Sequence, residues 1–241
     1  MSNLDKLIVG PGWPVTYNAD GLATVHNADF RADSKFAEAY RLGSATLTAF
    51  AGVDLRWRFY VCCWAAYQAK LNGGDFVECG VNTGALSRAV MHYIDFDSML
   101  DRTFYLLDTY DGVPLEQISH AERERGIADY NRHYPDCYAA ACSTFAPFKN
   151  AKIIRGRVPD TLVQIDPRKI SYVSIDMNVV EPELAAGEFL WPRMMTGAIM
   201  VLDDYGWRPH IAQKTAWDEF ARARGQMILA LPTGQGLLLK Q

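Results

Sequence analysis

Short apolar runs alternate with longer amphipathic stretches from about residue 76 onward, and this alternation predicts strands separated by helices. The strand-like runs are residues 76–81, 104–107, 153–154, 172–175, 199–202, 227–231 and 237–239. The helix-like stretches are residues 85–93, 120–134, 182–194 and 211–224. Strands that alternate with helices form a mostly parallel sheet covered on both faces. The seven strand-like runs therefore predict an α/β fold with a mostly parallel sheet of seven strands.

The two ends of the chain depart from this alternation. Only residues 232–235 separate the last two strand-like runs, which is too short for a crossover and predicts an antiparallel hairpin at the sheet edge. Residues 1–27 are rich in Gly, Pro and Asn and predict an irregular arm or lid. Ser34 is a candidate N-cap for a helix through Tyr40, and Asp54 is a candidate start for a second helix toward Gly73. We expect residues 1–72 to form this arm and helical extension, acting as a lid or oligomerisation element, and residues 73–241 to form the core domain.

Composition narrows the classes of partner. The 241 residues carry 24 Lys and Arg against 28 Asp and Glu, so the chain has no excess of positive charge and nucleic acid is disfavoured as a partner. The five cysteines form no C-x-x-C pair, which favours a reduced, cytoplasmic protein over a disulfide or zinc scaffold. Without a leader-like start or a long apolar run, the sequence predicts neither export nor a membrane span.

The polar residues that follow the first two core strands predict an adenosyl site. In open α/β sheets, ligands bind beyond the carboxyl ends of the strands. The first such strand leads into a glycine turn, and Asp108 follows the second at a spacing suited to both hydroxyls of a ribose. The candidate ligand-binding residues are Glu78, Gly80, Asn82, Thr83, Gly84 and Asp108.

The chemistry of this turn favours S-adenosylmethionine over a nicotinamide dinucleotide. The turn lacks the G-x-G-x-x-G pattern that binds a pyrophosphate, and Glu78 would repel phosphates but suit a cationic sulfonium. Taken alone, a glycine turn also closes many strand–helix units for structural reasons. A nicotinamide-dependent oxidoreductase is therefore the less favoured alternative.

Three aspartates follow the fourth and fifth strands and predict a metal site. Asp176 comes directly after one strand, and Asp203 and Asp204 follow the next. If these strands are neighbours, the three carboxylates converge, and Mg²⁺ would relieve their repulsion. Asp176 is also a candidate cofactor-binding residue. The alternative is that Asp203 or Asp204 caps a helix and that Asp176 pairs with an arginine such as Arg208.

The chain contains four motif segments in order, at residues 74–81, 108–114, Gly156 with 159–162, and 202–206. Together these segments resemble the macrocin O-methyltransferase family of bacterial sugar methyltransferases. The resemblance implies a Rossmann-like class I methyltransferase fold over residues 73–241 and S-adenosylmethionine as the methyl donor. It also implies Mg²⁺ on the three aspartates, a hydroxyl of a sugar or glycosylated product as acceptor, and a dimer or larger homo-oligomer.

One position departs from the family. The family's fourth strand commonly ends D-x-D, with the second aspartate as general base, whereas this chain has Asn178. An amide can orient a hydroxyl but cannot take its proton at neutral pH. His210 is the leading replacement base, because imidazole titrates near neutrality, although a histidine at a helix start is more often a surface or capping residue. A noncatalytic or metal-independent S-adenosylmethionine-binding protein is the main alternative.

Aromatic and charged residues near these segments have two interpretations each. Trp57, Tyr205 and Trp207 could line an acceptor pocket or belong to the core. The Arg56–Arg58 cluster could bind an anionic acceptor, but pairing with carboxylates is slightly favoured. Glu181 and Glu183 are interpreted as first-turn residues that favour the helix dipole.

Overall fold

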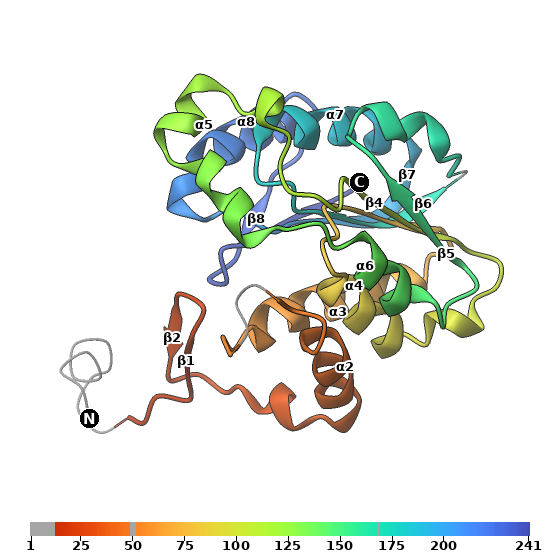
Figure 1. The fold of residues 1–241 in the computed structure, drawn as a ribbon. Helices are drawn as coiled ribbons and strands as arrows, with labels where there is room; N and C mark the ends of the chain where they lie inside the picture. Colours follow the sequence, from red (N-terminus) through yellow and green to blue (C-terminus); the bar gives the residue numbers. More distant parts are fainter. Residues whose placement is uncertain (1–12, 49–51, 168) are drawn as a thin grey trace.

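The central strands of the sheet are buried because helices cover both of its faces. The computed structural model describes residues 13–48, 52–167 and 169–241, and Figure 1 shows the sheet between two helical layers. The seven strands stand in the order β5-β4-β3-β6-β7-β9-β8. Their bounds are β3 (Asp75–Cys79), β4 (Phe104–Asp108), β5 (Ala151–Arg155), β6 (Ile170–Ile175), β7 (Met194–Leu202), β8 (Leu229–Ala230) and β9 (Gly236–Leu239). This confirms the predicted mixed sheet.

The order of the strands creates the crevice in which a ligand can bind. From β3 the chain passes to β4 and β5 on one side and then crosses to β6 and β7 on the other, all in parallel. The carboxyl ends of β3 and β6 therefore meet at a topological switch point. The predicted edge hairpin is present, with β9 antiparallel to both β7 and β8.

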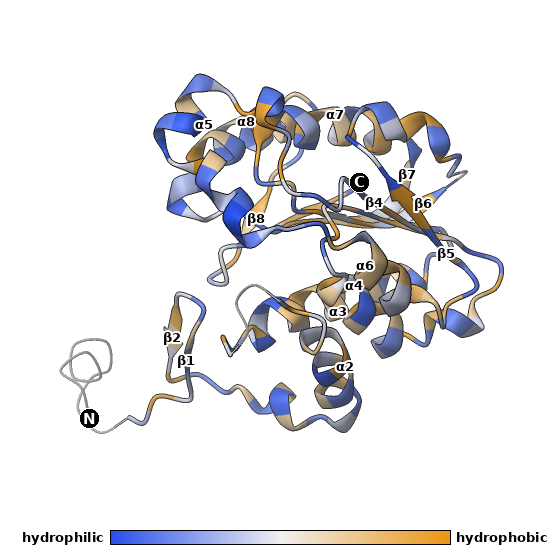
Figure 2. Cartoon of the chain, viewed as in Figure 1, coloured by the Kyte–Doolittle hydropathy of each residue, from blue (hydrophilic) through white to orange (hydrophobic). Residues whose placement is uncertain are grey.

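Alternation along each strand divides the core into two apolar clusters. Phe76 of β3 packs with the helices of one face, and its neighbour Val77 packs with those of the other. Figure 2 shows apolar residues gathered in the sheet and on the helix faces that cover it. The first layer contains α2 (Ser34–Ser44), α3 (Arg56–Lys70), α4 (Ala85–Tyr93) and α6 (Tyr138–Phe145), and the second contains α7 (Val180–Leu190) and α8 (Ile211–Arg222), with α5 (His120–Glu124) beside them.

The described part of the N-terminal segment is more regular than expected. Strands β1 (Tyr17–Ala19) and β2 (Leu22–Thr24) form a hairpin where an irregular arm was predicted, while residues 1–12 lie outside the described residues. The N-cap of α2 is Asp33 and not Ser34, because the Asp33 carboxylate accepts the Phe36 amide at 2.7 Å. Helix α3 packs into the same cluster as β3. A separate role for residues 1–72 stays a prediction.

Two other predicted helices have wrong boundaries. The helix expected over residues 120–134 is interrupted at Gly126, whose φ of +81° ends α5 before the 3-10 turn Ile127–His133. Helix α7 ends at Leu190, and β7 already begins at Met194. Helix α6 was not predicted at all. No helix in the described ranges is long and apolar enough to cross a bilayer.

Candidate functional site

A cavity of about 430 Å³ opens where the central parallel strands end. Glu78 of β3 and Asp108 at the end of β4 line it, together with Asp176 after β6 and Asp203 after β7. The volume falls in the usual range of small-molecule sites. The carboxyl-end residues that the sequence singled out therefore face one cavity.

The turn after β3 requires its glycines. Gly80 has a φ of +88°, and a Cβ there would overlap the backbone carbonyl of Asp176. Gly84, at φ +93°, begins α4 against the Phe145 ring, which a Cβ would meet at 2.5 Å. Gly80, Asn82 and Thr83 line the cavity, whereas Gly84 is not among the lining residues and serves the packing of α4.

Asp108 fixes the shape of this turn through backbone contacts that the sequence did not predict. Its Oδ2 accepts the amides of Val81 and Asn82 at 2.5 and 2.7 Å, and its Oδ1 accepts the amide of Tyr110 at 2.6 Å. The carboxylate therefore ties the turn after β3 to the end of β4. The Thr109 hydroxyl also lies 3.2 Å from Oδ1, and the carboxylate lines the cavity.

Glu78 is buried beside this turn. It is 2% exposed, and the Ser87 hydroxyl donates to its carboxylate. Burial raises the pKa of Glu78 to about 8, opposed by the Ser87 hydrogen bond. A cationic ligand nearby would favour the ionised form, as expected for a group that faces a sulfonium.

The three predicted metal ligands converge. Oxygen atoms of Asp176, Asp203 and Asp204 all lie within 4.8 Å of one another. Burial, and then repulsion from Asp203, raises the pKa of Asp176 well above its usual value. Burial also raises the pKa of Asp204, partly offset by His210. The three carboxylates therefore lie close enough to repel one another, as the magnesium hypothesis requires.

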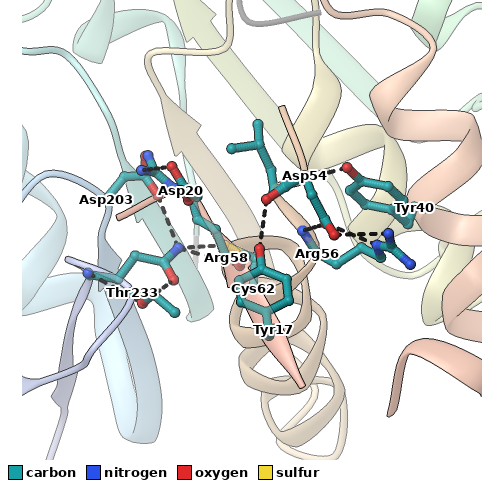
Figure 3. A network of polar contacts seen from close by, with 11 residues as sticks. Tyr17, Asp20, Tyr40, Asp54, Arg56, Arg58, Cys62, Asp203 and Thr233 are labelled. Carbon is teal, nitrogen blue, oxygen red and sulfur yellow. Dashed lines mark hydrogen bonds and ion pairs between the residues drawn. The ribbon is translucent and has the colours of Figure 1, made fainter. Parts of the chain in front are cut away.

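One arginine already enters this cluster, and it is Arg58 of α3. Its Nη1 donates to Asp203 at 2.6 Å, while its Nε and Nη2 donate to Asp20 at 3.2 and 3.3 Å (Figure 3). Gln235 donates to the other oxygen of Asp203 at 2.9 Å. Burial alone would lower the pKa of Arg58, but Asp203 and Asp20 outweigh it and raise that pKa.

These contacts decide between the alternatives left open by the sequence. Neither Asp203 nor Asp204 caps a helix, because the N-caps of the following 3-10 turn and of α8 are Trp207 and His210. The arginine in the cluster is Arg58, whereas Arg208 is exposed. Arg56 pairs with Asp54 at 2.8 Å, so the arginine pair is bound to carboxylates and does not present a free anion site.

The two candidate catalytic residues both face the cavity. His210 is 5% exposed, with its Nε2 lying 3.8 Å from Asp204 and its Nδ1 in contact with the Gln213 carbonyl oxygen. It is therefore buried in the site and is not a surface histidine. Asn178 takes a left-handed conformation at φ +66° and hydrogen-bonds the Tyr134 phenol.

Some site residues were missed, and some candidates lie elsewhere. Trp207 lines the cavity, but Trp57 packs on Phe30, and the Tyr205 hydroxyl donates to Asp218 at 2.6 Å. Glu183 is in the first turn of α7, as expected, but it is buried and accepts the Gln213 amide. The only signal for Gln213 in the sequence is its position one helical turn after His210.

The strand order, with the antiparallel β9 beside β7 and the cavity at the switch point, is that of the Rossmann-like class I methyltransferase fold. The profile of the macrocin-O-methyltransferase (TylF) family matches residues 58–228. The chain belongs to this family.

Similar proteins agree with this assignment. The 8-demethyl-8-(2,3-dimethoxy-alpha-L-rhamnosyl)-tetracenomycin-C 4'-O-methyltransferase of Streptomyces olivaceus is 25% identical over 138 residues. This match covers 55% of the chain and 53% of the relative, so the chain spans about half the length of that protein. The O-methyltransferase NovP has a TM-score of 0.66 at 20% identity, covering 76% of this chain and 79% of NovP. An O-methyltransferase from Bacillus cereus in complex with SAH has a TM-score of 0.53 at 12% identity, covering 86% and 91% of the two chains. The two structures show the shared fold.

Proposed function

We propose that this protein is an S-adenosylmethionine- and Mg²⁺-dependent O-methyltransferase that acts on a hydroxyl of a sugar or of a glycosylated natural product. The observation that carries the proposal is the meeting of a glycine turn and three crowded carboxylates in one cavity. Family membership supports methyl transfer. The name of the S. olivaceus relative, a methyltransferase of a rhamnosyl product, supports a sugar hydroxyl as acceptor.

The turn after β3 and the end of β4 would hold the methyl donor. Gly80 lets the backbone approach a ligand closely, and Asp108, which lines the same cavity, would accept a hydroxyl of the ribose. Glu78 and Asp176 add negative charge near the sulfonium. The complex of the B. cereus structural neighbour with SAH, the demethylated product S-adenosylhomocysteine, supports the same ligand class here.

Asp176, Asp203 and Asp204 would hold the Mg²⁺ ion. Hard carboxylate oxygens are the ligands that Mg²⁺ prefers, and three of them converge. With Asp20, four carboxylates surround the single guanidinium of Arg58, so the cluster keeps an excess of negative charge for a divalent cation. When bound, such an ion supplies Lewis acidity that lowers the pKa of a nearby hydroxyl.

His210 would take the proton of the acceptor hydroxyl. The acceptor oxygen forms its bond to the methyl carbon as the carbon–sulfur bond breaks, and the proton passes to Nε2 of His210. The products are the methyl ether, S-adenosylhomocysteine and an imidazolium. Asn178 would orient the hydroxyl through its amide. Tyr130, which also lines the cavity, would offer an aromatic ring to a sugar.

Asn178 favours one other candidate function. It stands where the family commonly has an aspartate, and a noncatalytic or metal-independent S-adenosylmethionine-binding protein could accommodate such a change. A homo-oligomeric state and a cytoplasmic location stay predictions from the sequence.

Calorimetry and a transfer assay test the proposal together. We expect S-adenosylhomocysteine and Mg²⁺ to bind the purified protein, and labelled methyl groups to be transferred to members of a glycoside panel. We expect EDTA to abolish the transfer and added Mg²⁺ to restore it. Binding of S-adenosylhomocysteine without transfer to any glycoside would favour the binding protein. EDTA-resistant transfer would contradict the metal requirement, and absence of both binding and transfer would overturn the whole proposal.

A further inference from the structure

The N-terminal hairpin reaches the cavity with its tip. Ala19 and Leu22 are paired, so Asp20 and Gly21 form a two-residue turn, and both have positive φ, at 51° and 74°. These are the values that a type I′ hairpin turn requires, and Asp-Gly is a preferred sequence for it. The turn therefore holds the Asp20 carboxylate in a defined position, where it lines the cavity.

Two contacts seat this tip on the rest of the site. The guanidinium of Arg58 lies between Asp20 and Asp203, with side chains that are 15%, 12% and 3% exposed (Figure 3). Gly21 lies over the Trp207 ring, which a Cβ on Gly21 would meet at 3.4 Å, and Arg58 stacks on the same ring at 5.2 Å. The hairpin tip, Trp207 and the carboxylate cluster thus share one arginine.

A further contact secures the base of the hairpin. The Tyr17 hydroxyl donates to the Asp54 carbonyl at 2.6 Å (Figure 3), and Tyr17 packs edge-on against Trp57. Tyr17 is buried, so the base is fixed to the start of α3 independently of the tip. Loss of the Asp20 contact should therefore loosen the tip without unfolding the segment.

The charge of the cavity bears on the acceptor. Seven carboxyl groups and two arginines line it. Of the two arginines, Arg132 is exposed and Arg58 is shared by Asp20 and Asp203. Even with the proposed Mg²⁺ bound, the four carboxylates of the cluster and of Asp20 exceed the charge of that ion and of Arg58 by one, so an anionic acceptor would meet repulsion there. An uncharged acceptor avoids this cost.

We propose that the Asp20–Gly21 tip is the acceptor-side wall of the cavity, and that Arg58 fixes it to the carboxylate cluster so that the site selects uncharged over anionic acceptors. The inference rests on the proposed function, because it assigns the wall of that site. Asp20 and Gly21 are specificity-determining residues in this arrangement, and Arg58 is a positioning residue.

Hydrogen exchange tests the fixing of the tip without any acceptor. In full-length Asp20→Asn, we expect the backbone amides of residues 16–24 to exchange at least about tenfold faster than in the wild type, because local opening controls exchange. Amides of β3 and α4 should be unchanged. Asp95→Asn is the matched control, since it removes one carboxylate from an exposed pair with Lys35. Unchanged exchange at the hairpin in Asp20→Asn would overturn the proposal.

Methyl transfer tests the wall itself, with 4-nitrophenyl α-L-rhamnoside as uncharged probe and 4-nitrophenyl β-D-glucuronide as anionic probe. Asp20→Asn should raise the KM for the rhamnoside by about tenfold, because the wall of the acceptor site is loosened. The ratio of the two kcat/KM values should shift toward the glucuronide, because Arg58 loses one of its two carboxylate partners. S-adenosylhomocysteine should bind as it does to the wild type. An unchanged KM and ratio would contradict the proposal. If the wild type neither binds S-adenosylhomocysteine nor methylates either probe, the proposed function is wrong. The hydrogen-exchange result still decides whether Arg58 fixes the tip.

Discussion

Gln213 donates its side-chain amide to Glu183 at 2.7 Å, and this hydrogen bond determines which end of the amide faces His210. The Gln213 carbonyl oxygen is left against Nδ1 of His210, so Nδ1 must be the donor. A neutral imidazole then has its free lone pair on Nε2, the nitrogen that lies near Asp204. Glu183 is itself held by the Trp217 indole at 2.8 Å. Gln213 and Glu183 thus orient His210 so that its Nε2 lone pair can accept a proton in the cavity.

Replacing Gln213 should therefore impair turnover without affecting donor binding. In Gln213→Leu, the His210 tautomer and ring orientation are no longer fixed, and we expect kcat to fall by about 10- to 100-fold, within the contribution of general-base catalysis. The affinity for S-adenosylhomocysteine should not change. The matched control is Gln226→Leu, whose side chain contacts only a neighbouring backbone carbonyl. Wild-type kcat with an unchanged pH profile would remove Gln213 from this role.

A rescue experiment separates His210 from the family's usual base. We expect His210→Gln to lower kcat by at least about 100-fold, because the amide cannot take a proton. Asn178 lies in the same cavity, where a carboxylate would match the D-x-D pattern of the family. The double variant His210→Gln/Asn178→Asp should regain part of the lost activity. Full activity of His210→Gln alone would show that another group is the base.

The proposed metal site is tested at Asp204, the second of the two aspartates after β7. Asp204→Asn removes one of three converging carboxylates, and we expect the affinity for Mg²⁺ to fall by at least about tenfold. Asp95→Asn provides a control with the same change of charge at the surface. Calorimetric titration of Mg²⁺ measures both variants. Equal Mg²⁺ affinity in Asp204→Asn and the wild type would argue against a metal on this cluster.

The sequence predicted the site where local patterns were sufficient. The apolar run of β3 ends at a glycine turn, and Asp108, Asp176 and Asp203 each follow or end a run of the same kind. Because parallel strands bring their carboxyl ends to one edge, these positions alone were enough to place the residues together. The fold class and the carboxylate cluster were predictable for this reason.

Contacts between elements that are far apart in the sequence could not be predicted in this way. Arg58 and Asp203 are 145 residues apart, and no local pattern relates an arginine of α3 to the end of β7. Gln213 is a polar helix residue that a sequence pattern assigns to the surface, yet it is buried between Glu183 and His210. The hairpin tip at Asp20 likewise gains its role only when it meets Arg58. Tertiary packing decides each of these cases.

Asp108 should contribute to both ligand binding and stability. Its three backbone contacts imply that Asp108→Asn weakens S-adenosylhomocysteine binding by about 10- to 100-fold and lowers the free energy of unfolding by roughly 1–3 kcal/mol. Asp111→Asn, an exposed carboxylate lining the same cavity, is the control for charge. Calorimetry and urea unfolding measure the two effects. If Asp108→Asn binds S-adenosylhomocysteine as the wild type does, the assignment of the donor site is wrong.

The buried carboxyl of Glu78 should make stability depend on pH in the unliganded protein. Its pKa is about 8 in the fold, above the usual 4.5, so the folded state binds more protons between these values and the free energy of unfolding falls as pH rises through them. Glu78→Gln keeps a neutral partner for Ser87 and should remove this loss, which we expect to reach roughly 3–5 kcal/mol. Urea unfolding at about pH 5 and about pH 9 measures the difference, with Glu219→Gln on the exposed face of α8 as control. A wild type and a Glu78→Gln variant that lose the same stability over this interval would show that Glu78 ionises in the fold at no cost.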